Sequence, residues 1–406
     1  MISAIRNDKV FIGVFILIFF FNRFMLPSNL QMSILLFPFF AYYLLHSKQF
    51  QNTLKAILLV LFIGLFALSD TIVLVDYFRS TLVMVFLVLF IHAFYVKVNR
   101  LKYFDKVFKV LTITNFILVL IALISLFIPY LKPHFWYLIP FTNGYDAIPR
   151  LKLFELEASH YSLGLLPLFM FYFWRLLKKI NWRDFLLLAS LSVSLVLSFS
   201  LGVLGVLVIS IIVVLLGNFF NLVVKENSRR VLFFIVLLLL SALVLLYIKF
   251  PDNPLFFRIQ NVFNGEDTSG RGRTYEAFDI AKVTLQEHSN KWFGIGLGQF
   301  KYFGKETLIN YYNYTLEPGV IRLPNCMAET LVTYGYLGFA LKLLIQAILF
   351  IKFKVYKNIY RFSIFTSIFI YQFTGSFLFN TTEYVLWVLC FSFSFPSFSS
   401  KEFFRK

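Results

Sequence analysis

Arginines in segments that adjoin long apolar runs are the first side chains in this 406-residue sequence that could do chemistry. Guanidinium is permanently charged and can grip a phosphate through two parallel hydrogen bonds. Arginines beside a bilayer therefore suit a lipid-linked diphosphate, although any single one could be a solvated loop charge or a headgroup contact. The candidates are Arg150, Arg258, Arg271, Arg273 and Arg322.

A carboxylate and a histidine three residues apart, Glu157 and His160, lie where a polar segment enters an apolar run. This spacing places both on one face of a helical turn. Such a pair could deprotonate a hydroxyl or hold a sugar by hydrogen bonds. The alternative is that Glu157 or Ser159 caps the helix that begins there. The two roles are compatible.

The segment Gly294-Ile295-Gly296-Leu297-Gly298 invites a nucleotide-binding interpretation. No strand–helix–strand pattern surrounds it, so tight turns and close backbone packing explain the glycines better. Several tyrosines follow, among them Tyr311 and Tyr312. They could stack on sugar faces or lie at a lipid interface, and the sequence leaves both possibilities open.

Metal and cofactor chemistry has little support. His134, His160 and His288 are far apart and have no partners at metal-ligand spacing. The Gly-x-Ser-x-Gly elbow of serine hydrolases is missing, and the two cysteines, Cys326 and Cys390, give no disulfide framework. We therefore expect neither a metal ion nor a cofactor.

The elements that position these residues are membrane helices. The chain is 59% hydrophobic and only 14% charged, too apolar for a soluble protein of this size. Apolar runs of nearly 20 residues recur along it, each long enough to span the hydrocarbon as a helix. The first run follows a basic start without a small-residue cleavage site, so we expect it to remain as the first helix.

About twelve transmembrane helices are expected, with boundaries accurate to several residues. They are placed at 10–26, 30–46, 56–70, 80–96, 110–130, 159–176, 184–199, 203–224, 231–250, 326–351, 362–379 and 384–399.

The net charge is +18, and the positions of the basic residues indicate how the chain is oriented in the membrane. Lys and Arg concentrate in every second connection, at 6–9, 48–55, 97–109, 175–183, 225–230, 352–361 and 401–406. This positive-inside pattern places both termini in the cytoplasm and gives no reason to expect a nucleic-acid partner.

Two segments are then expected on the non-cytoplasmic side, at 131–158 and 251–325. The second is the longest polar stretch, and its many aromatic residues argue against disorder. Within it, Tyr275, Phe278, Ala281 and Leu285 have helical spacing. We expect an amphipathic helix there, on the membrane surface or packed on the bundle.

The order of three short motifs resembles the O-antigen polymerase and ligase superfamily. WFGIGLGQF at 292–300, followed by LPNCMAETLVTYGYLGF at 323–339, is similar to the superfamily's late-loop signature. Glu157-Ala158-Ser159-His160 is similar to a Glu-Pro-Ser-His element of polysaccharide polymerases, with Ala158 where proline is common. The expected all-α fold, with cytoplasmic termini and one large periplasmic loop containing short helices, is also similar to that of the superfamily.

The resemblance implies a glycosyltransferase of the bacterial inner membrane, active on the periplasmic face. A glycan on undecaprenyl diphosphate is the donor, a lipid-linked repeat unit is the acceptor, and the lipid diphosphate leaves. The five arginines would contact the diphosphate, and Glu157 or His160 would serve as the base or position the acceptor. Asn325, Glu329, Tyr311 and Tyr312 would contact the glycan. A separate chain-length regulator is a possible partner.

One position separates the two activities of the superfamily. Ligases are expected to have a histidine in the large loop just before the next helix, where this chain reads Leu323-Pro324-Asn325. The sequence therefore favours an O-antigen polymerase. A ligase, a capsule polymerase and a flippase for lipid-linked oligosaccharide are the alternatives; a flippase predicts charged residues lining a central cavity.

Overall fold

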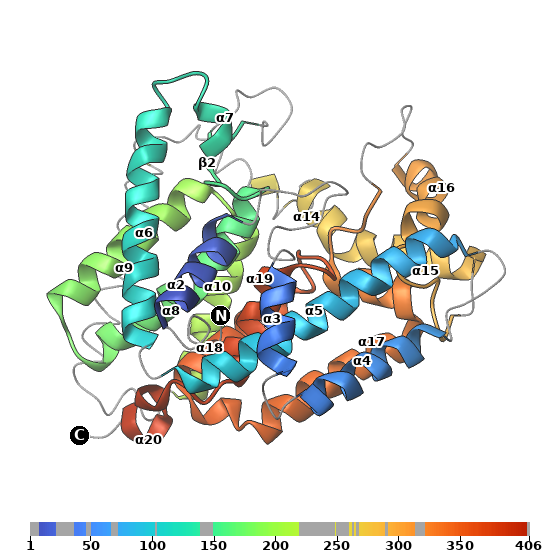
Figure 1. Cartoon of the computed structure of the whole chain (residues 1–406). Helices are drawn as coiled ribbons and strands as arrows, with labels where there is room; N and C mark the ends of the chain where they lie inside the picture. Colours follow the sequence, from blue (N-terminus) through green and yellow to red (C-terminus); the bar gives the residue numbers. More distant parts are fainter. Residues whose placement is uncertain are drawn as a thin grey trace.

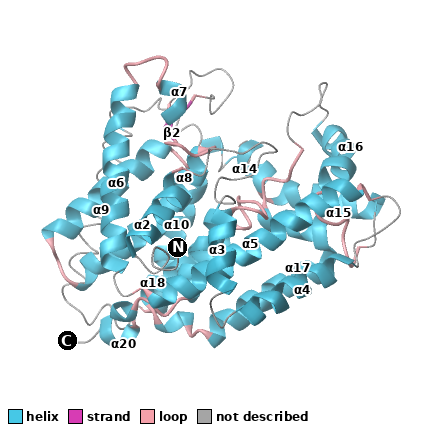
Figure 2. Ribbon diagram, viewed as in Figure 1, coloured by secondary structure: helices cyan, strands magenta, loops and turns pink. Residues whose placement is uncertain are grey.

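The computed structural model describes residues 8–21, 36–45, 50–65, 72–101, 104–138, 149–218, 248, 260–261, 264, 268–288, 291–312 and 321–403. Within these residues the protein is almost entirely helical (Figure 2). The exception is an antiparallel pair of two-residue strands, β1 (Trp136–Tyr137) and β2 (Arg150–Leu151), in which Tyr137 is opposite Arg150.

Long apolar helices form most of the described fold. Three of them have the length and composition to cross a membrane: α5 (Leu74–Arg100), α6 (Phe104–Ser125) and α17 (Cys326–Lys352). Other helices in the predicted apolar runs are α2 (Asp8–Phe20), α3 (Phe37–Leu45), α4 (Phe50–Leu65), α8 (Ala158–Lys178), α9 (Trp182–Ser198), α10 (Leu201–Gly217), α18 (Ile359–Tyr371) and α19 (Thr381–Phe391). A helix thus overlaps each predicted run that the structure describes, although the last, predicted for 384–399, ends at Phe391. The run at 231–250 is outside the described residues apart from residue 248.

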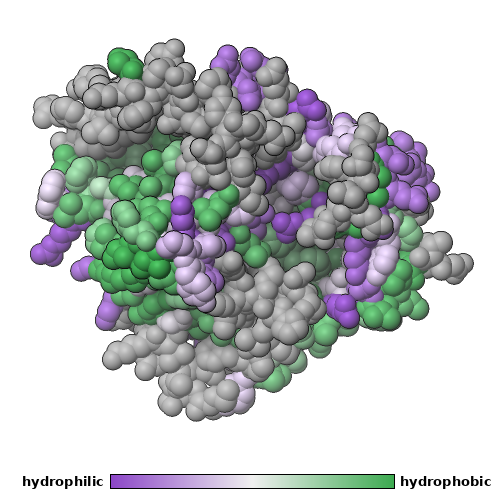
Figure 3. Space-filling view, turned by 90° about the horizontal axis from the view of Figure 1, so that it is seen from above, coloured by the Kyte–Doolittle hydropathy of each residue, from purple (hydrophilic) through white to green (hydrophobic). Residues whose placement is uncertain are grey.

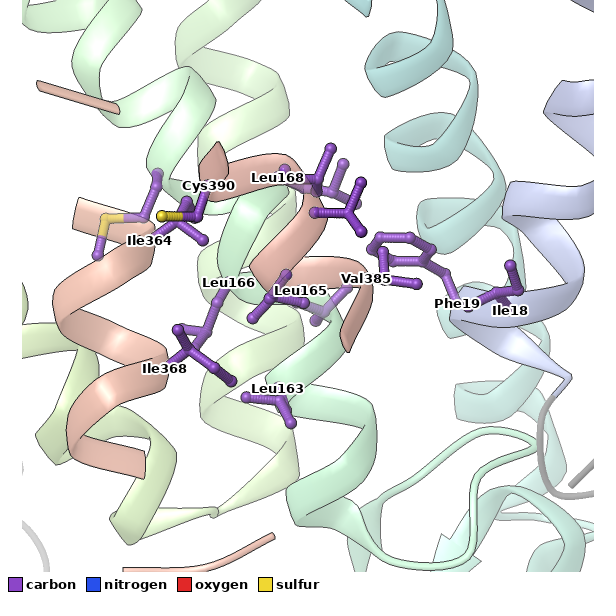
Figure 4. Close-up of a cluster of buried hydrophobic side chains, with 14 of the residues drawn as sticks. Ile18, Phe19, Leu163, Leu165, Leu166, Leu168, Ile364, Ile368, Val385 and Cys390 are labelled. Carbon is purple, nitrogen blue, oxygen red and sulfur yellow. The ribbon is translucent and has the colours of Figure 1, made fainter. Parts of the chain in front are cut away.

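Helix α8 lies at the centre of the main core because it is apolar almost all the way round. Its neighbours are α2, α9, α10, α18 and α19. Figure 4 shows Leu163 and Leu166 of α8 beside Ile368 of α18, with Phe19 of α2 near Val385 of α19. All five of these side chains are buried. This packing fixes the N-terminal end of α8, where Glu157 and His160 lie.

The large loop contributes short helices of its own. These are α14 (Thr268–Arg273), α15 (Tyr275–His288) and α16 (Phe300–Tyr312). Helices α15 and α16 lie at one end of the molecule and α14 lies nearer its middle (Figure 1), and α15 packs against α14, α16 and α17. The predicted amphipathic helix is confirmed as α15. Its buried apolar side chains are Ala277, Ile280, Ala281 and Leu285, beside the buried polar Glu276 and Thr284. Tyr275, which was predicted to share the apolar face, is exposed.

Helix α17 is folded back at Gly335, whose φ of 66° is left-handed and interrupts the helix. Lys342 Nζ lies 3.0 Å from Cys326 Sγ, although 16 positions separate the two residues. In a straight helix these residues would be about 24 Å apart along the axis. The two halves of α17 must therefore turn sharply at Gly335.

The segment after α18 departs from the prediction. One continuous helix is predicted for the apolar run 362–379, but α18 ends at Tyr371, and residues 372–380 form a loop that leads into α19. Asn380 caps α19, since its side-chain oxygen accepts a hydrogen bond from the Thr382 N–H at 3.1 Å. The predicted helix 362–379 is therefore too long. Residues 375–377, which were predicted to be helical, instead line the pocket described below.

Candidate active site

Glu157 is the residue on which the candidate site converges. It occupies the N-cap position of α8, but its side chain makes no capping hydrogen bond with that helix. Instead, its carboxylate accepts from the Ser159 hydroxyl at 3.2 Å. The second interpretation of the sequence, that Glu157 is a helix cap, is therefore wrong for its side chain.

Two arginines of the large loop pair with this carboxylate. Arg273 Nη2 lies 3.5 Å from Oε2 of Glu157, and Arg322 Nη2 lies 3.4 Å from Oε1. Arg273 is the last residue of α14, and Arg322 precedes α17. Three segments far apart in the sequence thus meet in one cluster of opposite charges.

A hollow opens beside this cluster. Its lining comes from the start of α8, the two arginines and the loop after α18, and its volume is about 320 Å³ including open solvent. The lining residues are Glu157, Ser159, His160, Arg273, Arg322, Leu323, Pro324, Tyr371, Gly375, Ser376 and Phe377. Seen from above, hydrophilic side chains gather over the middle and one side of the molecule, between apolar surfaces (Figure 3).

An aromatic ring completes the charged side of the pocket. The Phe377 ring centroid lies 5.5 Å from the guanidinium carbon of Arg322 and 5.5 Å from the His160 ring centroid. An arginine over an aromatic face is held by the ring quadrupole while its N–H groups stay free for other partners. The pocket can therefore offer guanidinium donors beside a flat apolar surface.

Charge sets the ionisation of Glu157. Burial opposes ionisation, but the positive charges of Arg273 and Arg322, and of His160 when it is protonated, outweigh it and lower the pKa of Glu157. A carboxylate held in this way is a good partner for guanidinium and a poor acceptor of a proton. Of the two roles predicted for Glu157, positioning therefore fits the geometry better than base catalysis.

Arg150 lies next to the pocket without lining it. Its guanidinium carbon is 4.6 Å from the ring centroid of Tyr137, its partner across the β1–β2 pair. Burial raises the pKa of Tyr137, and Glu157 adds to this rise, whereas the charges of Arg150, Arg273 and Arg322 lower it. Tyr137 therefore lies within the electric field of the same charges, with Arg150 at the edge of the cluster.

Asn325 and Glu329 lie behind the pocket walls. Asn325 is buried and caps α17, accepting from the N–H groups of Met327 and Ala328 at 3.0 and 2.9 Å. Its amide donates to the carbonyls of Arg273 and Phe373 at 2.7 and 2.6 Å. Asn325 therefore fixes the backbone of one pocket arginine.

Glu329 fixes the loop after α18, which forms another part of the pocket wall. Its carboxylate accepts a hydrogen bond from the Leu378 N–H at 2.6 Å. This holds the loop after α18 against α17, as does the bond from the Cys326 N–H to the Gly375 carbonyl at 3.2 Å. The side chains predicted to contact glycan at positions 325 and 329 thus contact the pocket's own backbone.

The remaining predicted residues form a second cluster outside the pocket lining. Arg271 Nε lies 2.9 Å from Oε1 of Glu276, and the Tyr312 hydroxyl donates to the other oxygen of that carboxylate at 3.0 Å. The Tyr311 ring packs against the Tyr312 ring, with centroids 5.1 Å apart. Arg258 lies outside the described residues.

The glycine-rich segment is a packing device, as its sequence predicted. Gly294, Gly296 and Gly298 have φ values of 80°, 91° and 73°. Ile295 N–H donates to the Val332 carbonyl at 2.9 Å, and Gly296 N–H donates to the Thr333 carbonyl at 3.0 Å. The segment thereby pairs with the backbone of α17 where that helix is interrupted.

Sequence reasoning missed Ser376 and Phe377 because they lie in a run interpreted as membrane helix. A local signal was present: Gly375-Ser376 and Asn380-Thr381-Thr382 combine a turn-forming pair with a helix N-cap. Ser376 has a φ of 63°, which is uncommon for a residue other than glycine.

In a comparison with family models, a model described as O-Antigen ligase matches residues 185–343. This region includes Arg273, Arg322 and Asn325, whereas Glu157 and Ser376 lie outside it. No curated protein matches the chain.

Proposed function

The chain is a member of the O-antigen polymerase/ligase superfamily, and on that premise we propose that it is an O-antigen polymerase. It would join repeat units carried on undecaprenyl diphosphate at the periplasmic face of the bacterial inner membrane. The observation that carries this proposal is the convergence of Arg273 and Arg322 on Glu157 in a pocket at the end of a bundle of apolar helices.

The arginine pair suits the leaving group. When an acceptor hydroxyl oxygen bonds to the anomeric carbon of the donor, the bond from that carbon to the diphosphate oxygen breaks and its electrons stay on the diphosphate. Guanidinium groups placed where this charge develops lower the barrier. Glu157 holds both arginines, and an arriving diphosphate would share or replace that contact.

The aromatic and polar lining suits the glycan. Phe377 and Tyr371 offer flat surfaces, and Ser159, His160 and Ser376 offer hydrogen-bonding groups for sugar hydroxyls. No nucleotide is needed, because a lipid diphosphate already activates the donor sugar.

A polymerase is favoured over a ligase by residue 325. The position where a ligase is expected to have a histidine holds Asn325, whose side chain is fully used in capping α17 and in binding two backbone carbonyls. The description of the matched family model keeps the ligase as the second candidate.

A deletion strain separates the candidates. Loss of a polymerase leaves lipopolysaccharide capped with a single repeat unit, loss of a ligase leaves polymer on undecaprenyl diphosphate, and loss of a flippase leaves no repeat outside the inner membrane. We expect the first result.

Complementation then tests the pocket. R273A and R322A should each lose the long ladder, because removing a charge-assisted contact costs about 1.5–3 kcal/mol, or roughly 10- to 150-fold in rate. The matched control is K282A, since Lys282 belongs to the same loop and pairs at the surface with Asp279. Normal ladders in both arginine variants, at normal protein levels, would refute the assignment of the pocket.

A further inference from the structure

A second carboxylate lies directly behind the pocket wall. Glu383, in the first turn of α19, is 1% exposed, and its Oε2 accepts a hydrogen bond from the hydroxyl of Ser376. Ser376 lines the pocket, so this hydroxyl connects the pocket to the buried acid. The ion-paired Glu157 lines the same pocket but does not take part in this connection.

The other oxygen of the Glu383 carboxylate, Oε1, also contacts neighbouring side chains. Trp387 Nε1 donates to Oε1 of Glu383 at 3.3 Å, and Cys326 Sγ lies 3.8 Å from the same oxygen. Lys342 reaches Cys326 because α17 is folded at Gly335, and its charge interacts with that of Glu383. Ionisable groups inside a membrane bundle are costly and are therefore rarely retained without a function.

Ser376 is placed with its backbone in an unfavourable conformation. Its φ of 63° costs about 1 kcal/mol or more for a residue with a Cβ, and glycine would adopt the same angle freely. The preceding residue is Gly375, so the chain places its glycine one position away from the left-handed site. Strain of this kind points to a use for the side chain.

The hydrogen bonds of Ser376 leave room for one ligand. Its hydroxyl donates to Glu383 and accepts from Nδ2 of Asn380 at 3.0 Å. Within the part of the chain that the structure describes, one acceptor lone pair of this oxygen remains, because a hydroxyl oxygen has two. The group that suits this lone pair is another hydroxyl, such as one on a sugar.

From this geometry we infer that Ser376 binds the attacking hydroxyl of the acceptor glycan and that Glu383 takes up the proton through it. The inference rests on the proposed function. As the acceptor oxygen bonds to the anomeric carbon, its proton passes to the Ser376 oxygen, and the Ser376 proton passes to Glu383. The bond to the diphosphate breaks, and its electrons leave with the diphosphate beside Arg273 and Arg322. Release of the Glu383 proton to water restores the starting state.

Glu157 is poorly suited to this step because both arginines occupy it and its pKa is lowered. Ser376 and Glu383 instead join a hydroxyl of the pocket lining to a carboxylate that is 1% exposed. If the pair merely held the loop together, its chemistry would not matter as long as the loop kept its shape.

The variant S376G distinguishes these two roles. Glycine fits the left-handed backbone and relieves its strain, which offsets part of the cost of losing the two hydrogen bonds of the hydroxyl, so the protein should still accumulate in folded form. The variant E383Q keeps the size of the side chain and a hydrogen-bond acceptor for Ser376 but binds no proton at that position. The matched control is C390A, which removes a buried thiol in the same helix, seven positions from Glu383 and outside the pocket lining.

The assay uses the full chain in lipid nanodiscs with the undecaprenyl-diphosphate-linked repeat extracted from the deletion strain. We expect kcat to fall by about 100-fold or more in S376G and E383Q, the usual share of general acid–base catalysis. KM should change less than about threefold, because the diphosphate contacts remain. C390A should retain its kcat.

The arginine variants make the two possible failures distinguishable. If R273A loses activity while S376G and E383Q keep normal kcat, the inference about Ser376 and Glu383 is wrong and the proposed polymerase stands. An unchanged kcat in all three variants would overturn both. A rise in KM of about 100-fold with unchanged kcat in S376G would also overturn the proton transfer, because it would indicate uniform substrate binding.

Discussion

Gly294 and Gly335 meet backbone to backbone: a Cβ on Gly294 would lie 2.5 Å from the amide nitrogen of Gly335. Both residues have positive φ, and hydrogen bonds flank the contact, with the Tyr336 N–H donating to the Lys291 carbonyl at 3.0 Å. The fold of α17 therefore depends on the glycine-rich segment. Because Asn325 and Cys326 start the same helix, the pocket depends on this contact as well.

Alanine at either glycine should weaken the protein. A left-handed residue with a Cβ costs about 1–3 kcal/mol, and the backbone clash adds to that cost. We expect G294A and G335A to lower the unfolding midpoint in detergent and to reduce the ladder. The control is G205A in α10, where a Cβ would meet no atom within 4 Å. Alanine inside a helix is favoured by about 0.5–1 kcal/mol, so this midpoint should hold or rise.

Substituting Asn325 should cost more than the loss of the helix cap alone. Loss of an N-cap costs about 1 kcal/mol, and N181A at the cap of α9 should show only that cost, with normal activity. N325A should also release the Arg273 carbonyl and lower the rate by about 10- to 100-fold through misplacement of the guanidinium. N325D keeps the acceptor for α17 but loses both donations, so its rate should resemble that of N325A. A rate in N325D equal to wild type would contradict this account.

The helices were predictable because their signals are local. Apolar runs such as Leu74–Arg100 and the helical spacing of 275–288 need no knowledge of distant residues. The pocket was only partly predictable, because only the fold brings Glu157 close to Arg322. The two residues are 165 positions apart in the chain. Ser376 was missed because its turn signal lies within the run predicted as the helix 362–379, and Glu383 because it stands in the short connection between that run and the next.

The ion pairs of Glu157 should give the protein an acid-sensitive component of stability. The pKa of this carboxyl is lowered in the folded protein from its ordinary value of 4.5. The folded state therefore binds the proton more weakly than the unfolded state does, and the pairs stabilise the fold fully above that ordinary value. This contribution is lost as the pH falls through the lower folded-state pKa.

The variant E157Q isolates this contribution. Its unfolding midpoint should lie below that of wild type at pH 7, and the difference should shrink as the pH is lowered through 4.5. Melting curves in detergent between pH 7 and pH 3.5 measure both quantities. A difference that stays constant over this range would show that Glu157 acts through packing and not through charge.

Arg271 and Arg273 are separated by one glycine, yet they serve different partners. Arg271 binds Glu276 in the next helix, whereas Arg273 binds Glu157 in the pocket. A sequence containing Arg-Gly-Arg cannot say which guanidinium faces the substrate, since both are exposed to a similar extent. The contacts predict that R273A lowers the rate far more than R271A does.

The partner carboxylates refine that comparison. Removing Glu276 should resemble R271A, because it breaks the same pair, and the double variant R271A/E276A should cost little more than either change alone. Removing the charge of Glu157 should leave Arg273 and Arg322 in place but poorly oriented. The loss of rate in the double variant E157Q/R273A should therefore be smaller than the sum of the two single losses. Rates from all four combinations in each cycle measure the two couplings. Equal rates for R271A and R273A would mean that the two arginines act together on one ligand.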